Sequence, residues 1–181
     1  MSVPVRDHSV LPPLRLAAPD VSDEPHLGST CFMVALPDDI RLRIEAPHIW
    51  YVGTVNPDGS PHVSPMWVGL DGDLLVFNTA VGRVKERNLR RDPRVCLSHA
   101  DPDDPYDRVQ IRGRAVRFVQ GPEADRNMDL LARNYLGTER FEWRIPGEQR
   151  VIVVIEPSRV RRVVGVEPLP RAASGADDLS K

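Results

Sequence analysis

The chain has 181 residues, a formal net charge of −2 at pH 7, and hydrophobic residues at 41% of its positions. This composition is typical of one ordinary globular domain, or of one domain with tails. The net charge disfavours a generally basic nucleic-acid-binding protein or a polybasic membrane-surface protein. No apolar run approaches the roughly 18 residues of a membrane-spanning helix. Because the start of the chain lacks a signal-peptide pattern and the cysteines are only Cys31 and Cys96, a reduced, cytoplasmic location is expected.

Prolines divide the chain into one domain and two tails. Five prolines fall within the first 30 residues, so residues 1–30 are expected to form an extended or disordered N-terminal arm. Residues 168–181 combine prolines, small residues and scattered charge, and they are expected to form a C-terminal tail. The folded domain is therefore expected at residues 31–167.

Inside this domain, turn residues separate short β-rich runs. Asn56-Pro57-Asp58-Gly59 has the residues of a tight turn, and Asp71-Gly72 is a strong signal for a two-residue hairpin. The expected strands are Ile49–Val55, His62–Leu70, Leu74–Thr79, Val95–His99, Val109–Val119, Arg150–Ile155 and Arg159–Val164. The expected helices are Pro37–Glu45, a segment between Gly82 and Pro93, and a segment between Pro122 and Gly137. This pattern predicts an α+β barrel or sandwich of antiparallel strands with a few helices.

Several common catalytic motifs are absent from the sequence. There is no G-x-G-x-x-G after a strand, no P-loop and no G-x-S-x-G elbow. The five histidines are scattered, with no His-x-x-x-His or Cys-x-x-Cys spacing, so no metal site is expected.

The segment Arg83–Arg94 concentrates positive charge at the start of the expected second helix. It holds six cations and two anions, a net charge of +4, and its Lys85 is the only lysine before the C-terminal residue. A helix N-terminus offers free backbone N–H groups and a positive dipole end. With a hydroxyl from Thr79, close approach at Gly82, and charge from Arg83 and Lys85, the segment predicts a phosphate site. A solvated helix face beside a dimer interface is the alternative, and Arg90, Arg91 and Arg94 are expected to bind carboxylates on a neighbouring strand or subunit.

The stretch Asn56–Ser98 resembles the flavin/deazaflavin oxidoreductases with a split β-barrel fold, the superfamily of pyridoxamine-phosphate oxidase. Asp101–Val116 and Tyr135–Val160 are similar to it as well, and the resemblance spans Leu36–Val164. Its most specific part is the pattern G-R-x-K-x-x-N-L-x-R-D-P-R at Gly82–Arg94. Within the superfamily, the sequence most resembles the probable coenzyme F420-dependent enzymes.

The resemblance implies a homodimeric split β-barrel with two cofactor sites at the subunit interface. The cofactor phosphate would bind Arg83 and Lys85 near Gly82, and Tyr106 in the Asp101–Arg108 loop of the partner subunit would close the site. The cofactor ring would contact two strands through Ser64, Pro65, Met66, Trp67, Phe77, Asn78 and Thr79. The alternative for Met66, Trp67 and Phe77 is core packing, the alternative for Tyr106 is an exposed loop aromatic, and Asn88 is interpreted as structural.

These features predict an F420-dependent oxidoreductase that transfers a hydride between the deazaflavin and an unknown electron-poor small molecule. No side chain stands out as a general acid, so no catalytic residue is assigned. The alternatives are an FMN-dependent oxidoreductase on the same barrel, a non-catalytic F420 or flavin carrier, and an arginine-rich module that contacts nucleic acid. Vitamin B6 oxidation is disfavoured because the Arg/Trp-rich C-terminal substrate segment of pyridoxamine-phosphate oxidase is missing.

Overall fold

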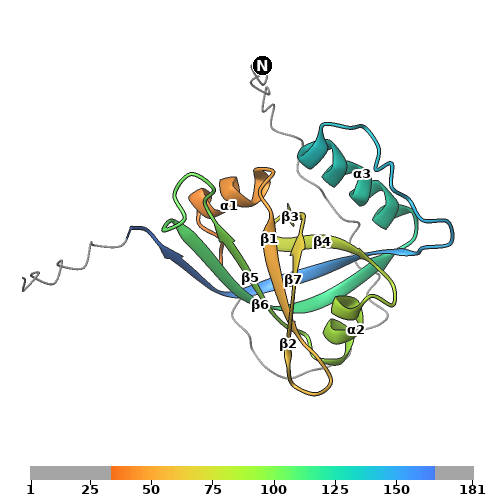
Figure 1. The fold of residues 1–181 in the computed structure, drawn as a ribbon, viewed down its shortest axis with the longest axis horizontal. Helices are drawn as coiled ribbons and strands as arrows, with labels where there is room; N and C mark the ends of the chain where they lie inside the picture. The colour runs from red at the N-terminus through yellow and green to blue at the C-terminus, as the bar shows by residue number, and fades with distance from the viewer. Residues whose placement is uncertain (1–33, 166–181) are drawn as a thin grey trace, which may run out of the picture.

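The structure is a computed structural model that describes residues 34–165, which form seven strands and three helices (Figure 1). The helices are α1 (Asp38–Glu45), α2 (Val84–Arg91) and α3 (Pro122–Leu136). The strands are β1 (Trp50–Val55), β2 (Pro61–Met66), β3 (Val68–Asp71), β4 (Leu74–Ala80), β5 (Arg94–Ala100), β6 (Arg108–Gln120) and β7 (Arg150–Val163). The predicted arm at residues 1–30 and the predicted tail at 168–181 lie outside the described residues.

Two strand predictions were wrong in their boundaries. The run predicted as the single strand His62–Leu70 is two strands, β2 and β3, separated by Trp67. The runs predicted as Arg150–Ile155 and Arg159–Val164 are one continuous strand, β7. Proline has no N–H to give to a neighbouring strand, but Pro157 is tolerated within β7 because it lies at a register shift next to Gly113 of β6.

The order of the strands shows how the sheet closes. Every pair is antiparallel, and the order is β2-β1-β5-β6-β7-β4-β3, so β2 and β3 are the two edges of one sheet. Only Trp67 separates these edge strands, and two Cα–Cα steps span less than about 8 Å. The sheet must therefore curl until its edges meet at Trp67. Because β2 and β3 do not pair with each other, the result is the predicted antiparallel split β-barrel.

The helices cover different parts of this barrel. Helix α1 packs against β3, α2 packs against β1, and α3 crosses β4, β6 and β7. Figure 1 shows α1 and α2 at opposite ends of the barrel, with α3 on its outside. No helix within residues 34–165 is long and apolar enough to cross a membrane.

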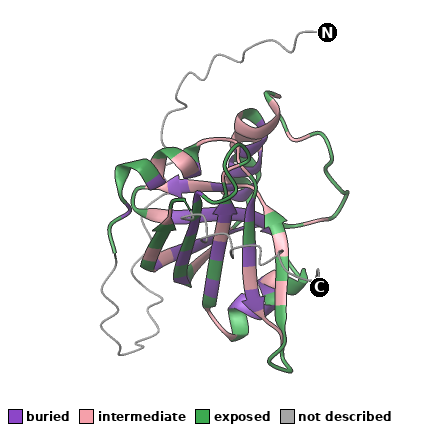
Figure 2. Cartoon of the chain, turned by 60° about the vertical axis from the view of Figure 1, so that its left-hand side comes forward, coloured by how far each residue is buried: buried purple, intermediate pink, exposed green. Residues whose placement is uncertain are grey.

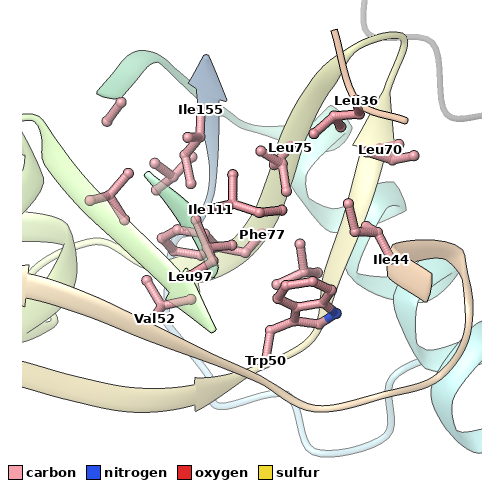
Figure 3. Packing of buried hydrophobic residues seen from close by; sticks show 14 of the residues in the cluster. Leu36, Ile44, Trp50, Val52, Leu70, Leu75, Phe77, Leu97, Ile111 and Ile155 are labelled. Carbon is pink, nitrogen blue, oxygen red and sulfur yellow. The ribbon is translucent and has the colours of Figure 1, made fainter. Parts of the chain in front are cut away.

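A hydrophobic core fills the barrel, and a smaller cluster lies under α3. Along β4, Leu75 and Phe77 belong to the barrel core, while Val76 belongs to the cluster with Ala124 of α3. Figure 2 shows buried and exposed positions along the strands, and Figure 3 shows Phe77 lying among residues from other strands. Both faces of β4 are thus covered, which explains its nearly continuous burial.

Helix α3 has the end signals that the sequence predicted. Pro122 stands in its first turn, where the missing N–H costs no helical hydrogen bond. Gly137 follows the last helical residue in the left-handed conformation, with φ of 73°, and its N–H donates to the Arg133 carbonyl. Ala124, Met128 and Leu131 are buried on one side of the helix, which holds α3 against the sheet.

Replacing Gly113 with Ala is expected to lower the free energy of unfolding by about 1–3 kcal/mol. A β-carbon at this position would lie 2.5 Å from the Glu156 carbonyl oxygen and 2.8 Å from Ile155 Cγ2. Because that oxygen belongs to the backbone of β7, the strand itself has to move. Urea unfolding at pH 7 measures the loss.

The matched control is Gly69→Ala, in a strand of the same sheet. Its β-carbon would meet Leu131 Cδ2 at 3.6 Å and Val76 Cγ2 at 3.7 Å, which are ordinary contacts. We expect a change below about 0.5 kcal/mol there. Equal losses in the two variants would contradict the steric explanation at Gly113.

Candidate functional site

The junction between β4 and α2 has the backbone geometry of an anion site. Gly82 adopts a φ of 83°, which disfavours any residue with a β-carbon, and the space around it is open. Arg83 precedes the helix without providing a side-chain cap. The first N–H groups of α2 therefore have no intrahelical acceptor, and they lie at the positive end of the helix dipole.

Lys85 lies in the first turn of α2 and is half-buried. Within residues 34–165 its ammonium group makes no hydrogen bond or ion pair. Burial lowers the pKa of Lys85, and the nearby charge of Arg83 lowers it further. An anion bound here would supply the charge partner that this group lacks.

Arg83 differs from Lys85 because its charge is already paired. Its Nη2 atom lies 2.6 Å from Glu148 Oε1. Glu148 also has Oε2 3.1 Å from Arg150 Nη2, an ion pair without hydrogen-bond geometry. A phosphate bound at Arg83 would have to share this guanidinium with Glu148.

Glu86 was not predicted as part of the junction between β4 and α2, but its carboxylate forms hydrogen bonds with two groups of this junction. Its carboxylate is buried, accepts the Gly82 N–H at 3.0 Å through Oε2, and accepts Arg90 Nε through Oε1. A glutamate at the third helical position often accepts a hydrogen bond from the backbone before the helix. This position of Glu86 in the sequence could have predicted its role. The Gly82 N–H is therefore occupied by a group of the chain itself.

Arg90, Arg91 and Arg94 do not bind carboxylates of a neighbouring strand in this chain, so that prediction was wrong. Arg90 binds Glu86 of its own helix, and Arg94 binds Asp92 with Nη2–Oδ2 at 2.6 Å. Arg91 donates to the Val55 carbonyl, which is on a neighbouring strand but is not a carboxylate. One helical turn places Glu86 beside Arg90, and Asp92 is two residues from Arg94, so these two carboxylates come from the segment itself.

Two of the predicted hydroxyl groups are buried. Among residues 34–165, Thr79 Oγ1 and Ser64 Oγ find no hydrogen-bond partner, and Thr79 is 2% exposed. Thr79 is on the same face of β4 as Phe77, and Ser64 pairs with the buried Val52 of β1, so both side chains face the barrel interior. A buried hydroxyl without a partner costs free energy, and such groups are common where a ligand supplies the missing bond.

Of the remaining predicted ring contacts, the side chains of Phe77, Met66 and Asn78 make packing or hydrogen-bond contacts within the chain, whereas Pro65 lies on the surface. The Phe77 side chain is fully buried in the core, and Met66 packs against that core. Asn78 Nδ2 donates to the Ala124 carbonyl at 2.7 Å and to Asn127 Oδ1 at 3.0 Å, which fixes α3 to β4. Pro65 is exposed on the edge strand β2.

Trp67 connects the barrel edge to the basic junction through residues that the sequence did not reveal. It stacks on Tyr135 at 5.1 Å and meets the edge of Phe141 at 6.0 Å between ring centroids. Arg150 lies over the Phe141 ring at 5.0 Å, and Arg150 in turn pairs with Glu148. Phe141, Glu148 and Arg150 therefore belong to the surroundings of the site.

Tyr106 is exposed and lies far from Lys85 within one chain. Its loop follows β5, whereas α2 precedes β5, and six residue steps of strand between Arg94 and Ala100 span about 20 Å. Tyr106 and Lys85 of one chain therefore lie at opposite ends of β5. This placement agrees with the predicted contribution from a partner subunit, which stays a prediction.

Replacing Asp107 with Asn is expected to lower the Tm by several degrees at pH 7. Asp107 Oδ2 accepts Arg162 Nη2 at 2.8 Å and Arg43 Nη2 at 2.6 Å, and these bonds fix the end of the Tyr106 loop. The hydrogen bonds from Arg162, and then those from Arg43, lower the pKa of Asp107 to about 2. The carboxylate therefore stabilises the fold above its unfolded pKa of about 4, and this contribution is lost as the pH falls toward 2.

Calorimetry at pH 7, 4 and 2.5 measures this dependence. The Tm difference between the two proteins is expected to shrink steadily over that range. A difference that stays constant down to pH 2.5 would show that the carboxylate charge is not responsible.

The part of this chain that matches known proteins is the part that forms the barrel. The family described as pyridoxamine 5'-phosphate oxidase matches residues 36–164. A solved structure named F420 Reductase is 30% identical, and the match covers 70% of this chain and 98% of that chain with a TM-score of 0.58. A conserved hypothetical protein from Mycobacterium tuberculosis is 23% identical, with 83% and 100% of the two chains covered and a TM-score of 0.57. HupZ from group A Streptococcus is 13% identical, with 70% and 94% covered and a TM-score of 0.54, and these last two show likeness of fold alone.

Proposed function

This chain belongs to the pyridoxamine 5'-phosphate oxidase family, in the flavin/deazaflavin oxidoreductase superfamily, and from that membership we propose that it is an F420-dependent oxidoreductase. The half-buried Lys85 ammonium, which has no charge partner within residues 34–165, carries this proposal. It lies at the start of a helix beside an open glycine, where a phosphate group gains both a full charge and backbone donors. The 30% identity to F420 Reductase supports the deazaflavin as the cofactor.

The residues of the chain would hold the cofactor by its anionic part and by its ring. Lys85 and the first N–H groups of α2 would bind the phosphate, and the Thr79 and Ser64 hydroxyls would form hydrogen bonds with the cofactor. Bound reduced F420 supplies a hydride for an electron-poor acceptor. The protein contributes position and exclusion of water, and positioning alone is worth about 7–11 kcal/mol of barrier when the geometry is favourable.

FMN is the alternative cofactor, because its phosphate would meet the same lysine and the same helix end. A carrier that binds F420 without turnover is the alternative to an enzyme. Titration of the purified protein with F420 and with FMN, followed by absorbance and fluorescence, separates the cofactors. Micromolar binding of FMN with no binding of F420 would refute the proposal.

Turnover separates an enzyme from a carrier. Reduced F420 is incubated with the protein and a panel of quinone, enone and tetrapyrrole acceptors, and its oxidation is followed by absorbance. We expect oxidation faster than in the protein-free control with at least one acceptor. Tight binding of F420 without oxidation by any of them favours the carrier.

We also propose that the domain at residues 31–167 acts as a homodimer. The outer face of β1 and β2 exposes Tyr51 (54%) and Val63 (60%), and Tyr51 pairs in register with the exposed Pro65. An apolar sheet face of this kind favours association, and the Tyr106 loop of a partner would then reach the cofactor site. Sedimentation equilibrium at micromolar concentration should give twice the chain mass of 20.3 kDa, and a monomer mass would contradict the dimer.

A further inference from the structure

The loop between α3 and β7 brings a carboxylate to the junction between β4 and α2. Its last residue, Gln149, accepts the Val81 N–H at 2.9 Å through its backbone carbonyl, which fixes this end of the loop beside the end of β4. The neighbouring Glu148 has Oε1 2.6 Å from Arg83 Nη2 and Oε2 3.1 Å from Arg150 Nη2. The carboxylate therefore lies between two cations, one before α2 and one at the start of β7.

The Glu148 carboxylate is better shielded from water than the arginine that it binds at the junction. Its side chain is 14% exposed, whereas that of Arg83 is 47% exposed. Burial and the nearby charge of Arg83 lower the pKa of Lys85, so these two cations lie close enough to interact. Because a shielded charge is screened weakly, Glu148 acts on an anion held at Lys85 and Arg83 more strongly than an exposed carboxylate would.

The other groups of the junction are also occupied by the chain itself. Glu86 accepts the Gly82 N–H, and Arg87 donates to the Gly82 carbonyl. Among the cations of α2 and the residue before it, every arginine has a hydrogen-bond or ion-pair partner in the described part of the chain, and Lys85 has none there. One positive charge is therefore free for a ligand, while a second negative charge on that ligand would face carboxylates of the junction.

Phosphate groups differ in the charge that they bring to this junction. A phosphodiester carries one negative charge at pH 7, whereas a phosphomonoester carries about 1.5 to 2. We propose that Glu148 is a specificity-determining residue, which makes the junction accept a phosphodiester in preference to a phosphomonoester. This inference rests on the proposed function, because F420 contains a phosphodiester and the alternative cofactor FMN contains a phosphomonoester. Glu148 thus separates the two cofactors by the charge of the phosphate rather than by the ring.

Replacing Glu148 with Gln removes the charge and keeps the size of the side chain and an oxygen that can accept from Arg83. Coulomb energy is proportional to the charge of the ligand, so the loss of one negative charge favours a dianion twice as much as a monoanion. A gain of about tenfold in affinity for a phosphomonoester should therefore accompany a gain of about threefold for a phosphodiester. The ratio of the two affinities thus reports the charge of Glu148 and cancels effects that are common to both ligands.

Fluorescence titration with two probes tests this role of Glu148. The probes are 8-hydroxy-5-deazariboflavin 5'-phosphate and its methyl ester, which share the deazaflavin ring and differ in the charge of the phosphate. At pH 7.5 and 50 mM salt, we expect the wild-type protein to bind the methyl ester more tightly. Glu148→Gln is expected to shift the ratio of the two dissociation constants at least threefold in favour of the phosphomonoester. A wild-type protein that prefers the phosphomonoester would overturn the inference, even if Glu148→Gln did not fold.

The matched control is Glu142→Gln, which removes the same charge from an exposed position of the same loop. It should leave the ratio unchanged, and equal shifts in the two variants would overturn the inference because they would indicate general charge attraction. Binding of both probes with the same ratio in the wild-type protein and in Glu148→Gln would overturn it as well, while the proposed function would stand. If neither probe bound the wild-type protein, the proposed function itself would fail, and the inference with it.

Discussion

Replacing Lys85 with Ala is expected to raise the Kd for F420 by about 10- to 150-fold. A hydrogen bond to a charged group contributes about 1.5–3 kcal/mol, and each 1.4 kcal/mol is a factor of ten in the dissociation constant. The ammonium group makes no hydrogen bond or ion pair within residues 34–165, so its removal breaks none there and the loss of polar interaction falls on the ligand. Fluorescence titration of both proteins with F420 measures the ratio.

The structure separates the expected contributions of Lys85 and Arg83. Arg83 is paired with Glu148 at 2.6 Å, so a phosphate that binds it must compete with a carboxylate of the same chain. We therefore expect Arg83→Ala to have a smaller effect on the Kd than Lys85→Ala. The reverse order would show that Glu148 turns away from Arg83 when the cofactor binds.

The matched control for Lys85→Ala is Arg126→Ala. Arg126 is an exposed cation on α3, so its loss changes the net charge equally without touching the junction. Its Kd should stay within twofold of the wild-type value. An unchanged Kd in Lys85→Ala itself would place the cofactor phosphate elsewhere on the barrel.

Local chemistry explains how much of the fold was predictable. Turn residues such as Asp71-Gly72 act through neighbouring backbone angles, so the hairpin between β3 and β4 was predicted, although its two loop residues are Gly72 and Asp73, one position later than expected. The break at Trp67 was missed because the run from His62 to Leu70 has no turn residue at that point. It exists because the sheet closes there, and closure depends on the whole order of strands.

The residues of the candidate site also divide into those that a short segment of sequence predicts and those that only the fold brings together. The place of Lys85 and Gly82 at the start of α2 was predictable because a lysine in an arginine-rich chain and a glycine before a helix are visible in one short segment. Glu148 was not predictable because it is 65 residues from Arg83, and only the pairing of β4 with β7 brings the two together. Trp67 and Phe77 fit a core position and a ligand contact equally well until their neighbours are known.

Replacing Phe77 with Ala is expected to lower the free energy of unfolding by about 3–5 kcal/mol, a large part of the stability of an ordinary domain. Phe77 is 0% exposed and belongs to the barrel core with Trp50, Leu97 and Ile111 (Figure 3). Its loss leaves a cavity between strands that are paired on both sides and cannot collapse freely. Urea unfolding at pH 7 measures the change, with an unchanged slope as evidence that only stability is affected.

A comparison of three variants decides between core packing and ring contact for Phe77. Tyr106→Ala removes an exposed aromatic side chain and should change the stability by less than about 0.5 kcal/mol. Phe77→Leu keeps most of the buried volume, so it should cost less than Phe77→Ala and leave the Kd for F420 unchanged. If Phe77→Leu instead weakens F420 binding tenfold while remaining stable, the ring at this position serves the cofactor, and the assignment of Phe77 to core packing alone is wrong.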